Sequence, residues 1–174
     1  MGDFATHLDQ RRTLADGREV TIRPIEHDDE AAERRFFERL CGESKRLRFL
    51  KFVSCVNEQL IHRFTHVDYH RQMAFVCEAT VDGRKELVGE ARYAANNGRS
   101  CEFSVVIADD WHKSGIAGLL MVALIRYARA SGFETMEGMV LRDNRAMVRF
   151  VRALDFEVAP VPEEPTLLRV VRQL

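Results

Sequence analysis

The segment from Cys101 to Gly118, CEFSVVIADDWHKSGIAG, constrains the fold of this chain more than any other. It predicts a buried strand over residues 102–107, then a turn of small residues, and then the start of a helix over 115–131. The helix is expected because apolar residues recur at the spacing of one helical face. These residues are Ile116, Leu119, Leu120, Ala123, Leu124 and Tyr127. A strand that leads into a long amphipathic helix indicates a sheet with a helix packed on it.

Patterns elsewhere in the chain predict further strands and helices. Apolar runs bounded by turns predict strands over 19–25, 73–80, 86–93, 135–141, 156–158 and 167–171. Helical spacing predicts helices over 28–40, 44–49 and 57–64, and another that begins at Asp143 or Asn144. The mixed charges of 28–39 indicate a solvated helix face. This order of elements predicts an α/β (α+β) fold with a single mixed β-sheet and helices on both faces.

Length and composition narrow the class of protein. The chain has 174 residues, which favours a single domain over 1–174, and we expect residues 1–12 to be flexible. With 26 basic and 27 acidic residues, nothing calls for nucleic acid or a membrane as a partner. The four cysteines are widely spaced and form no C-x-x-C pair. Together with the lack of a secretory signal, this predicts reduced thiols in a cytoplasmic protein.

The turn over 112–118 is suited to an anion. Backbone N–H groups at the start of a helix point along the positive end of its dipole, which favours phosphate. Gly115, Ala117 and Gly118 carry little bulk, so a phosphate could approach the backbone closely. A phosphate site beside an acidic residue, Glu102, suggests an enzyme with a phosphorylated cofactor.

Glu102 is a candidate general base. Side chains alternate along a strand, so Glu102 shares one face with Ser104 and Val106 and lies opposite Phe103. If the face of Phe103 packs under the long helix, Glu102 faces a cleft, where burial would raise its pKa. A carboxylate in that position could accept a proton from an attacking amine.

Two motifs carry a resemblance to a known family. Residues 112–117, HKSGIA, match a phosphate loop written Gln/Arg-x-x-Gly-x-Gly/Ala, apart from His112 at its first position. Residues 144–156 match a second block that begins with Asn and ends in Leu-Gly-Phe, apart from Asp155 in place of Gly. With these motifs on the expected elements, the chain resembles the GNAT superfamily of acyl-CoA-dependent N-acyltransferases.

The resemblance implies acetyl-CoA as the cofactor. The backbone of 105–107 would pair with its pantetheine arm, the loop would hold the pyrophosphate, and Asn144 would orient the arm. Many members of the family carry a Tyr general acid in the following helix, but Val151 stands at that place. The cofactor-binding residues that the resemblance implies are Val105, Val106, Ile107, His112, Lys113, Ser114, Gly115, Ile116, Ala117, Gly118, Asn144 and Met147.

A narrower resemblance concerns the acceptor. Segments such as TIRPIEHDDE and THVDYHRQMAF are similar to the acetyltransferase domain of Pat-type protein lysine acetyltransferases. This implies direct transfer in a ternary complex, with Glu102 as the general base and a lysine of an acyl-CoA synthetase as the acceptor. A small amine or amino acid is a second acceptor, and a non-catalytic acyl-CoA sensor is a different class of function. Family analogy also suggests a homodimer formed through a sheet edge.

Three histidines are spaced by four residues, at His62, His66 and His70. His62 and His66 would share a helical face, a spacing that metal sites use. Asp68 and Tyr69 predict that the helix ends before His70, and no cysteine lies nearby. The family needs no metal, so we expect none here.

Overall fold

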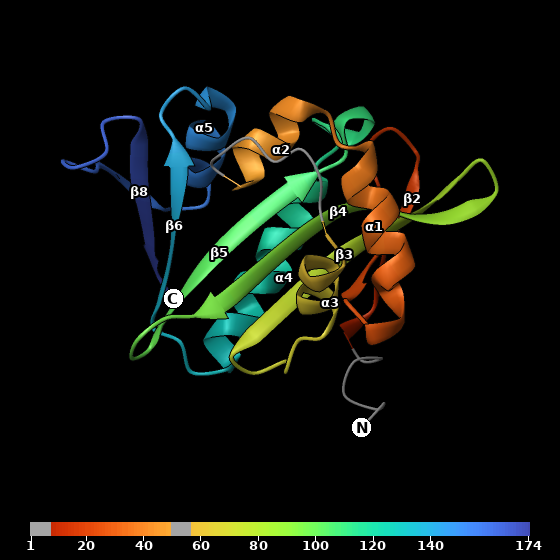
Figure 1. Cartoon of the computed structure of the whole chain (residues 1–174), viewed down its shortest axis with the longest axis horizontal. Helices are drawn as coiled ribbons and strands as arrows, with labels where there is room; N and C mark the ends of the chain where they lie inside the picture. The colour runs from red at the N-terminus through yellow and green to blue at the C-terminus, as the bar shows by residue number, and fades with distance from the viewer. Residues whose placement is uncertain (1–7, 50–56) are drawn as a thin grey trace.

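A mixed sheet of eight strands, in the order β1-β2-β3-β4-β5-β6-β8-β7, organises the computed structural model, which describes residues 8–49 and 57–174 (Figure 1). All neighbouring pairs in this sheet are antiparallel except β5 and β6. The strands are β1 Gln10–Thr13, β2 Glu19–Pro24, β3 Gln72–Val81, β4 Arg84–Ala95, β5 Ser100–Ile107, β6 Thr135–Leu141, β7 Glu157–Pro160 and β8 Leu167–Gln173. The helices are α1 Glu30–Arg39, α2 Gly42–Phe49, α3 Glu58–Thr65, α4 Ile116–Ala130 and α5 Arg145–Ala153, with short 3-10 turns η2 His27–Asp29 and η3 Asp109–Trp111.

Helices cover both faces of the sheet, as expected from the order of elements (Figure 1). On β3, Met73, Phe75 and Cys77 belong to the core under α4. Ala74 and Val76 belong to a second core under α1 and α3. Because β3 is buried on both faces, its sequence is a nearly continuous apolar run.

The long helix α4 uses the apolar face that its sequence predicts. Ile116, Leu120 and Leu124 are fully buried. Gly89 on β4 makes this close packing possible, because a Cβ there would lie 3.1 Å from side-chain atoms of Ile116 and Leu120 and 2.8 Å from Ile107. A bulkier residue would push α4 away from the sheet.

The edges of the sheet differ from the expectation. Residues 10–12, which we expect to be flexible, belong to β1, and β1 pairs with β2 in antiparallel register from Gln10 to Thr13. At the other edge, β8 lies between β6 and β7, so the last strand of the chain is internal. Within the described residues, no helix is long and apolar enough to span a bilayer.

The start of α1 is held to β2 by the side chain of its N-cap residue. Asp29 is the N-cap residue, but its side chain makes no capping hydrogen bond. Its carboxylate instead accepts hydrogen bonds from the Arg23 guanidinium at 2.7 Å and from the Glu26 N–H at 2.8 Å. Asp29 therefore links β2 to η2 and α1 by side-chain bonds.

Candidate functional site

Strands β5 and β6 form a fork (Figure 1). They pair in parallel only from Ser100 to Glu102, opposite Thr135 to Glu137, and then diverge. A cleft of about 240 Å³ lies beyond the branch point, lined by residues 103–107 of β5 and 139–141 of β6. Beyond Glu102, the edge of β5 that faces β6 has no strand partner among the described residues. An extended ligand with amide groups can add to such an edge as a strand does.

Helices and one turn complete the walls of the cleft. Ala117 at the start of α4 and His112 in the turn before it lie at one side. The wall of the cleft is mostly apolar, with polar groups near the ends of α4, α5 and α2. A cleft of this kind fits a ligand with a long apolar arm and a charged end. The lining residues from α5 and its cap are Asn144, Ala146, Met147 and Phe150, and those from α2 are Ser44, Leu47 and Arg48.

The cleft brings together about half of the residues that the sequence predicts for cofactor binding. The predicted residues that line it are Val105, Val106, Ile107, His112, Ala117, Asn144 and Met147. The predicted residues outside the lining are Lys113, Ser114, Gly115, Ile116 and Gly118, together with the predicted base Glu102. The Ile116 side chain packs in the core with no exposed surface, so only its backbone can contribute to binding.

The turn before α4 has the backbone shape of an anion site. Lys113 and Gly115 have positive φ values of 63° and 90°, and Gly115 is the N-cap of α4 without a side-chain cap. The Ser114 N–H donates to the Trp111 carbonyl and the Ile116 N–H to Ser114 Oγ, each at a long 3.4 Å. The first turn of a helix leaves its N–H groups without intrahelical acceptors, so this end of α4 can bind phosphate.

The flank of this turn is open to a ligand. A Cβ added at Gly115 or at Gly118 would meet no atom within 4 Å. His112 sits beside the turn, and its Nε2 lies 3.1 Å from the Ile107 carbonyl oxygen. His112, the first residue of the loop motif, therefore contacts the end of β5, although the family pattern has Gln or Arg at this position.

Asn144 caps α5, as the sequence predicts. Its side-chain oxygen accepts a hydrogen bond from the Met147 N–H at 3.1 Å. Val151, at the place of the family's Tyr, is fully buried in the core, whereas Phe150 next to it lines the cleft. Neither side chain can donate a proton, so α5 supplies no general acid from these positions.

Glu102 lies at the branch point of the fork, but its environment differs from the expectation. Phe103 does pack into the core that contains α4, so Glu102 is on the opposite face of the sheet. There its side chain is exposed, and the expected burial is wrong. Its neighbour in the β5–β6 register is Glu137, which accepts hydrogen bonds from Asn96 and Arg169 at 2.9 Å. Glu102 is thus accessible to a bulky partner from solvent.

A buried ionic cluster on the same face of the sheet escaped the sequence analysis. Glu90 and Arg92 of β4 form a bidentate ion pair at 2.6 and 2.7 Å. Glu33 of α1 lies 3.6 Å from Arg92, and Arg48 of α2 lies 3.7 Å from Glu90. Because Arg48 also lines the cleft, the cluster adjoins the candidate site. The expectation that residues 28–39 form only a solvated face is wrong at Glu33, whose exposed fraction is 0%.

The pKa values of the two buried carboxyl groups are shifted in opposite directions. Burial, and then the nearby charge of Glu90, raise the pKa of Glu33 well above its usual value. Burial also acts to raise the pKa of Glu90, but the charge and hydrogen bonds of Arg92 and the hydrogen bond with Glu33 outweigh it and lower that pKa. Glu33 therefore keeps its proton to a higher pH than Glu90 does.

The sequence does carry a signal for this cluster. Glu33 precedes Phe36 and Phe37 by three and four residues, so it lies on their helical face. Glu90 and Arg92 flank Ala91 on a strand, so they share one face of a sheet that is otherwise apolar. Charged residues on predicted core faces are the pattern that identifies buried ion pairs.

Comparison with known proteins gives matches over most of the chain. Residues 19–157 match the family model of the Acetyltransferase (GNAT) domain. An acetyltransferase of Pseudomonas aeruginosa is 38% identical over 156 residues, which cover 88% of this chain and 83% of that protein. The GNAT domain of S. lividans PAT is similar in structure, with a TM-score of 0.88 and 23% identity over 99% of this chain and 100% of that chain.

A larger solved protein contains a similar domain. The cAMP-binding acyltransferase from Mycobacterium smegmatis matches with a TM-score of 0.64 and 21% identity, over 97% of this chain and 48% of that chain. At such identities the solved structures show a shared fold, and their substrates are not assigned to this chain.

Proposed function

Because this chain belongs to the GNAT family of acetyltransferases, whose acyl donor is acetyl-CoA, we propose that it acetylates the ε-amine of a protein lysine, with Glu102 as general base. The proposed acetyl-CoA site is inferred from the forked cleft. This cleft combines a strand edge that has no partner among residues 8–49 and 57–174, an apolar wall and a helix N-terminus within one slot. The acceptor proposal rests on the Pat-like sequence segments and on the exposure of Glu102.

Each wall of the cleft has a role in holding the donor. The β5 edge over 103–107 would hydrogen-bond to the amides of the pantetheine arm. The N–H groups at the start of α4 would bind the pyrophosphate, beside the open flank of Gly115 and Gly118. Asn144, held by its capping bond to Met147, would orient the arm from the α5 side.

Acetyl transfer requires a free amine. A lysine ammonium, with a pKa of about 10.4, is protonated at neutral pH and cannot attack a thioester. Glu102 would accept that proton directly or through one water molecule, and the neutral amine would then attack the thioester carbonyl. A backbone N–H on the β5 edge that lines the cleft would donate to the oxygen that becomes negative. The C–S bond breaks as the amide forms, and the second proton, which the attacking nitrogen loses in this step, passes through water to the thiolate, since Val151 and Phe150 supply none.

The exposure of Glu102 favours a protein acceptor over a small metabolite. A metabolite site encloses most of its ligand. Glu102 instead faces solvent at the branch point, while its neighbour Glu137 is paired with Arg169. A lysine on a protruding loop can reach such a position, and the negative charge of Glu102 would attract the ammonium group.

The test is acetyl-CoA-dependent acetylation of an acyl-CoA synthetase from the same organism, with acetyl-lysine measured by mass spectrometry. Glu102→Gln should lower the rate by about 10²–10⁴-fold while acetyl-CoA binding is retained. Glu157→Gln, which changes an exposed glutamate on β7, is the matched control and should be as active as wild type. Full activity of Glu102→Gln would refute the base. Acetyl-CoA binding without any transfer to the synthetase would refute this acceptor.

A further inference from the structure

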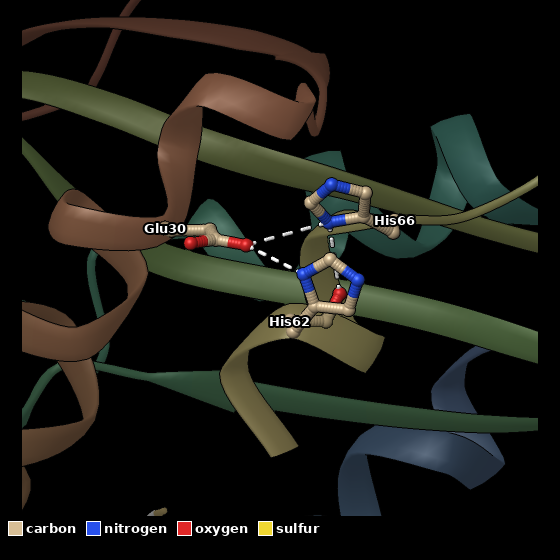
Figure 2. A group of neighbouring side chains, drawn as sticks. All are labelled: Glu30, His62 and His66. Carbon is tan, nitrogen blue, oxygen red and sulfur yellow. Dashed lines mark hydrogen bonds and ion pairs between the residues drawn. The ribbon is translucent and has the colours of Figure 1, made fainter. Parts of the chain in front are cut away.

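A second group of titratable side chains lies where α3 packs against η2 and α1, and none of its members lines the cleft (Figure 2). His62 comes from α3, His66 is the C-cap of that helix, and Glu30 is the first residue of α1. Figure 2 shows one nitrogen of each imidazole directed toward the same Glu30 oxygen. His62 Nδ1 lies 2.8 Å and His66 Nδ1 lies 3.5 Å from Glu30 Oε1.

These distances are close to those between the ligands of a tetrahedral metal ion. Nitrogen and oxygen atoms bound to zinc at about 2.0–2.1 Å lie roughly 3.3–3.5 Å from one another. The contact from His66 to Glu30 Oε1 has this length, the contact from His62 is shorter, and all three ligand atoms are within 4.8 Å of one another. His66 Nδ1 also lies 3.1 Å from the His62 carbonyl oxygen and from Thr65 Oγ1, so an ion bound here would replace these two contacts.

The local structure holds the ligands in place. The four-residue spacing of His62 and His66 puts both on one side of α3, and the Asn57 side chain caps the start of this helix by accepting from the Leu60 N–H at 2.9 Å. The His66 ring stacks on two others, with its centroid 3.7 Å from that of His62 and 4.3 Å from that of His27. Three of the six histidines in the chain thus stack together, and two of them contact the Glu30 carboxylate.

We propose that Glu30, His62 and His66 form a binding site for a divalent transition metal ion of the zinc type. Two imidazole nitrogens and one carboxylate oxygen are a donor set that suits zinc, and they leave a fourth position for water. The sequence spacing shows the two histidines but not Glu30, which lies 32 residues from His62. The site therefore goes against the expectation of no metal, because its third ligand comes from a different helix.

Such an ion would link α3 to α1. Binding to the folded state alone stabilises a protein in proportion to the logarithm of the ligand concentration over its dissociation constant. At zinc concentrations about 100 times the dissociation constant, the melting temperature should rise by about 5–10 °C. The acetyl-CoA cleft lies elsewhere, so this site is independent of the proposed lysine acetylation.

The experiment uses the full chain without an affinity tag, freed of metal by a chelator and then titrated with zinc chloride in a calorimeter. We expect one zinc ion per chain in wild type and at least about tenfold weaker binding in His62→Ala and in Glu30→Gln. His70→Ala is the matched control, since His70 is an exposed histidine outside the cluster. It should bind zinc as wild type does.

Two further measurements report on geometry and folding. Cobalt in place of zinc should give the intense visible absorption of a tetrahedral site in wild type and lose it in His62→Ala. Circular dichroism checks that the variants fold, and the conservative Glu30→Gln change keeps the shape of the side chain. The proposal is overturned if wild type shows no saturable binding of zinc, if both cluster variants bind as tightly as wild type, or if His70→Ala loses binding as they do.

Discussion

Two regions on the same face of the sheet use carboxylates in opposite ways. In the buried cluster, Glu90 is enclosed and Arg92 is largely buried, and the pKa of Glu90 is lowered by Arg92 and by the hydrogen bond with Glu33. At the fork, Glu102 of β5 pairs with Ala94 of β4, and its carboxylate faces solvent. Burial thus makes a carboxylate structural in the first region, while exposure leaves one available for chemistry in the second.

The contrast between the buried cluster and the exposed Glu102 is tested most directly by a substitution at Arg92. Arg92→Met removes the cation that binds Glu90 in a bidentate pair, so the buried carboxylate keeps only the more distant Arg48, at 3.7 Å, as a positive neighbour. We expect a loss of about 3–5 kcal/mol in the free energy of unfolding, measured by urea denaturation. Arg63→Met, at an exposed arginine on α3, is the control and should change stability by less than about 0.5 kcal/mol. A loss below about 1 kcal/mol for Arg92→Met would contradict the role assigned to the buried pair.

The fork can be tested at the start of α4. Gly118→Glu adds a negative charge in open space near the proposed pyrophosphate site. Acetyl-CoA affinity should fall by about tenfold through charge repulsion, which corresponds to about 1.4 kcal/mol. Stability should stay the same or rise, because an acidic side chain is favourable in the first turn of a helix. Calorimetric binding and thermal unfolding measure the two effects.

Gly118→Ala is the control that separates charge from bulk at this position. Its Cβ enters the same open space but brings no charge, so acetyl-CoA should bind it nearly as tightly as wild type. Equal affinity in the Glu and Ala variants would argue against a phosphate at this end of α4.

The protonation of Glu33 predicts a pH dependence. In the unfolded state Glu33 loses its proton above a pH of about 4.5, whereas in the folded state its raised pKa keeps the proton bound to higher pH. The free energy of unfolding therefore decreases as the pH rises from about 4.5 toward the pKa of the folded state. Glu90 has the opposite sign, since its lowered pKa of about 2 makes stability rise between that pH and 4.5. Glu33→Gln should remove the first effect, so that its stability relative to wild type improves with rising pH. Urea denaturation at several pH values measures this, and a constant difference would contradict a protonated Glu33.

The smallest effect is expected for an exposed ion pair. Arg99 and Glu134 form a salt bridge whose side chains are 66% and 61% exposed. Arg99→Gln should cost no more than about 0.5 kcal/mol in thermal unfolding, because water screens the pair. If Arg99→Gln lowered the free energy of unfolding as much as Arg92→Met does, burial would not explain the difference between the buried and the exposed ion pair.

The parts of the fold that could be predicted are those with local causes. The alternation on β3 and the apolar spacing on α4 define which residues face the core, and the Asn144 side chain caps α5 through a bond within one turn. The strand–turn–helix segment likewise predicted the turn that precedes α4. In contrast, the pairing of β8 between β6 and β7 depends on contacts between distant residues, which no local pattern specifies.

The sequence by itself determined the elements, the family motifs and the chemical types of the candidate residues, because propensity, periodicity and capping act within a few residues. Tertiary structure alone decided that Glu102 is exposed, that Glu33 meets Glu90 and Arg92, and that Glu30 meets His62 and His66. Burial and charge environment are set by which elements pack together, so a glutamate can serve as a buried core group, an accessible carboxylate or a partner of two histidines.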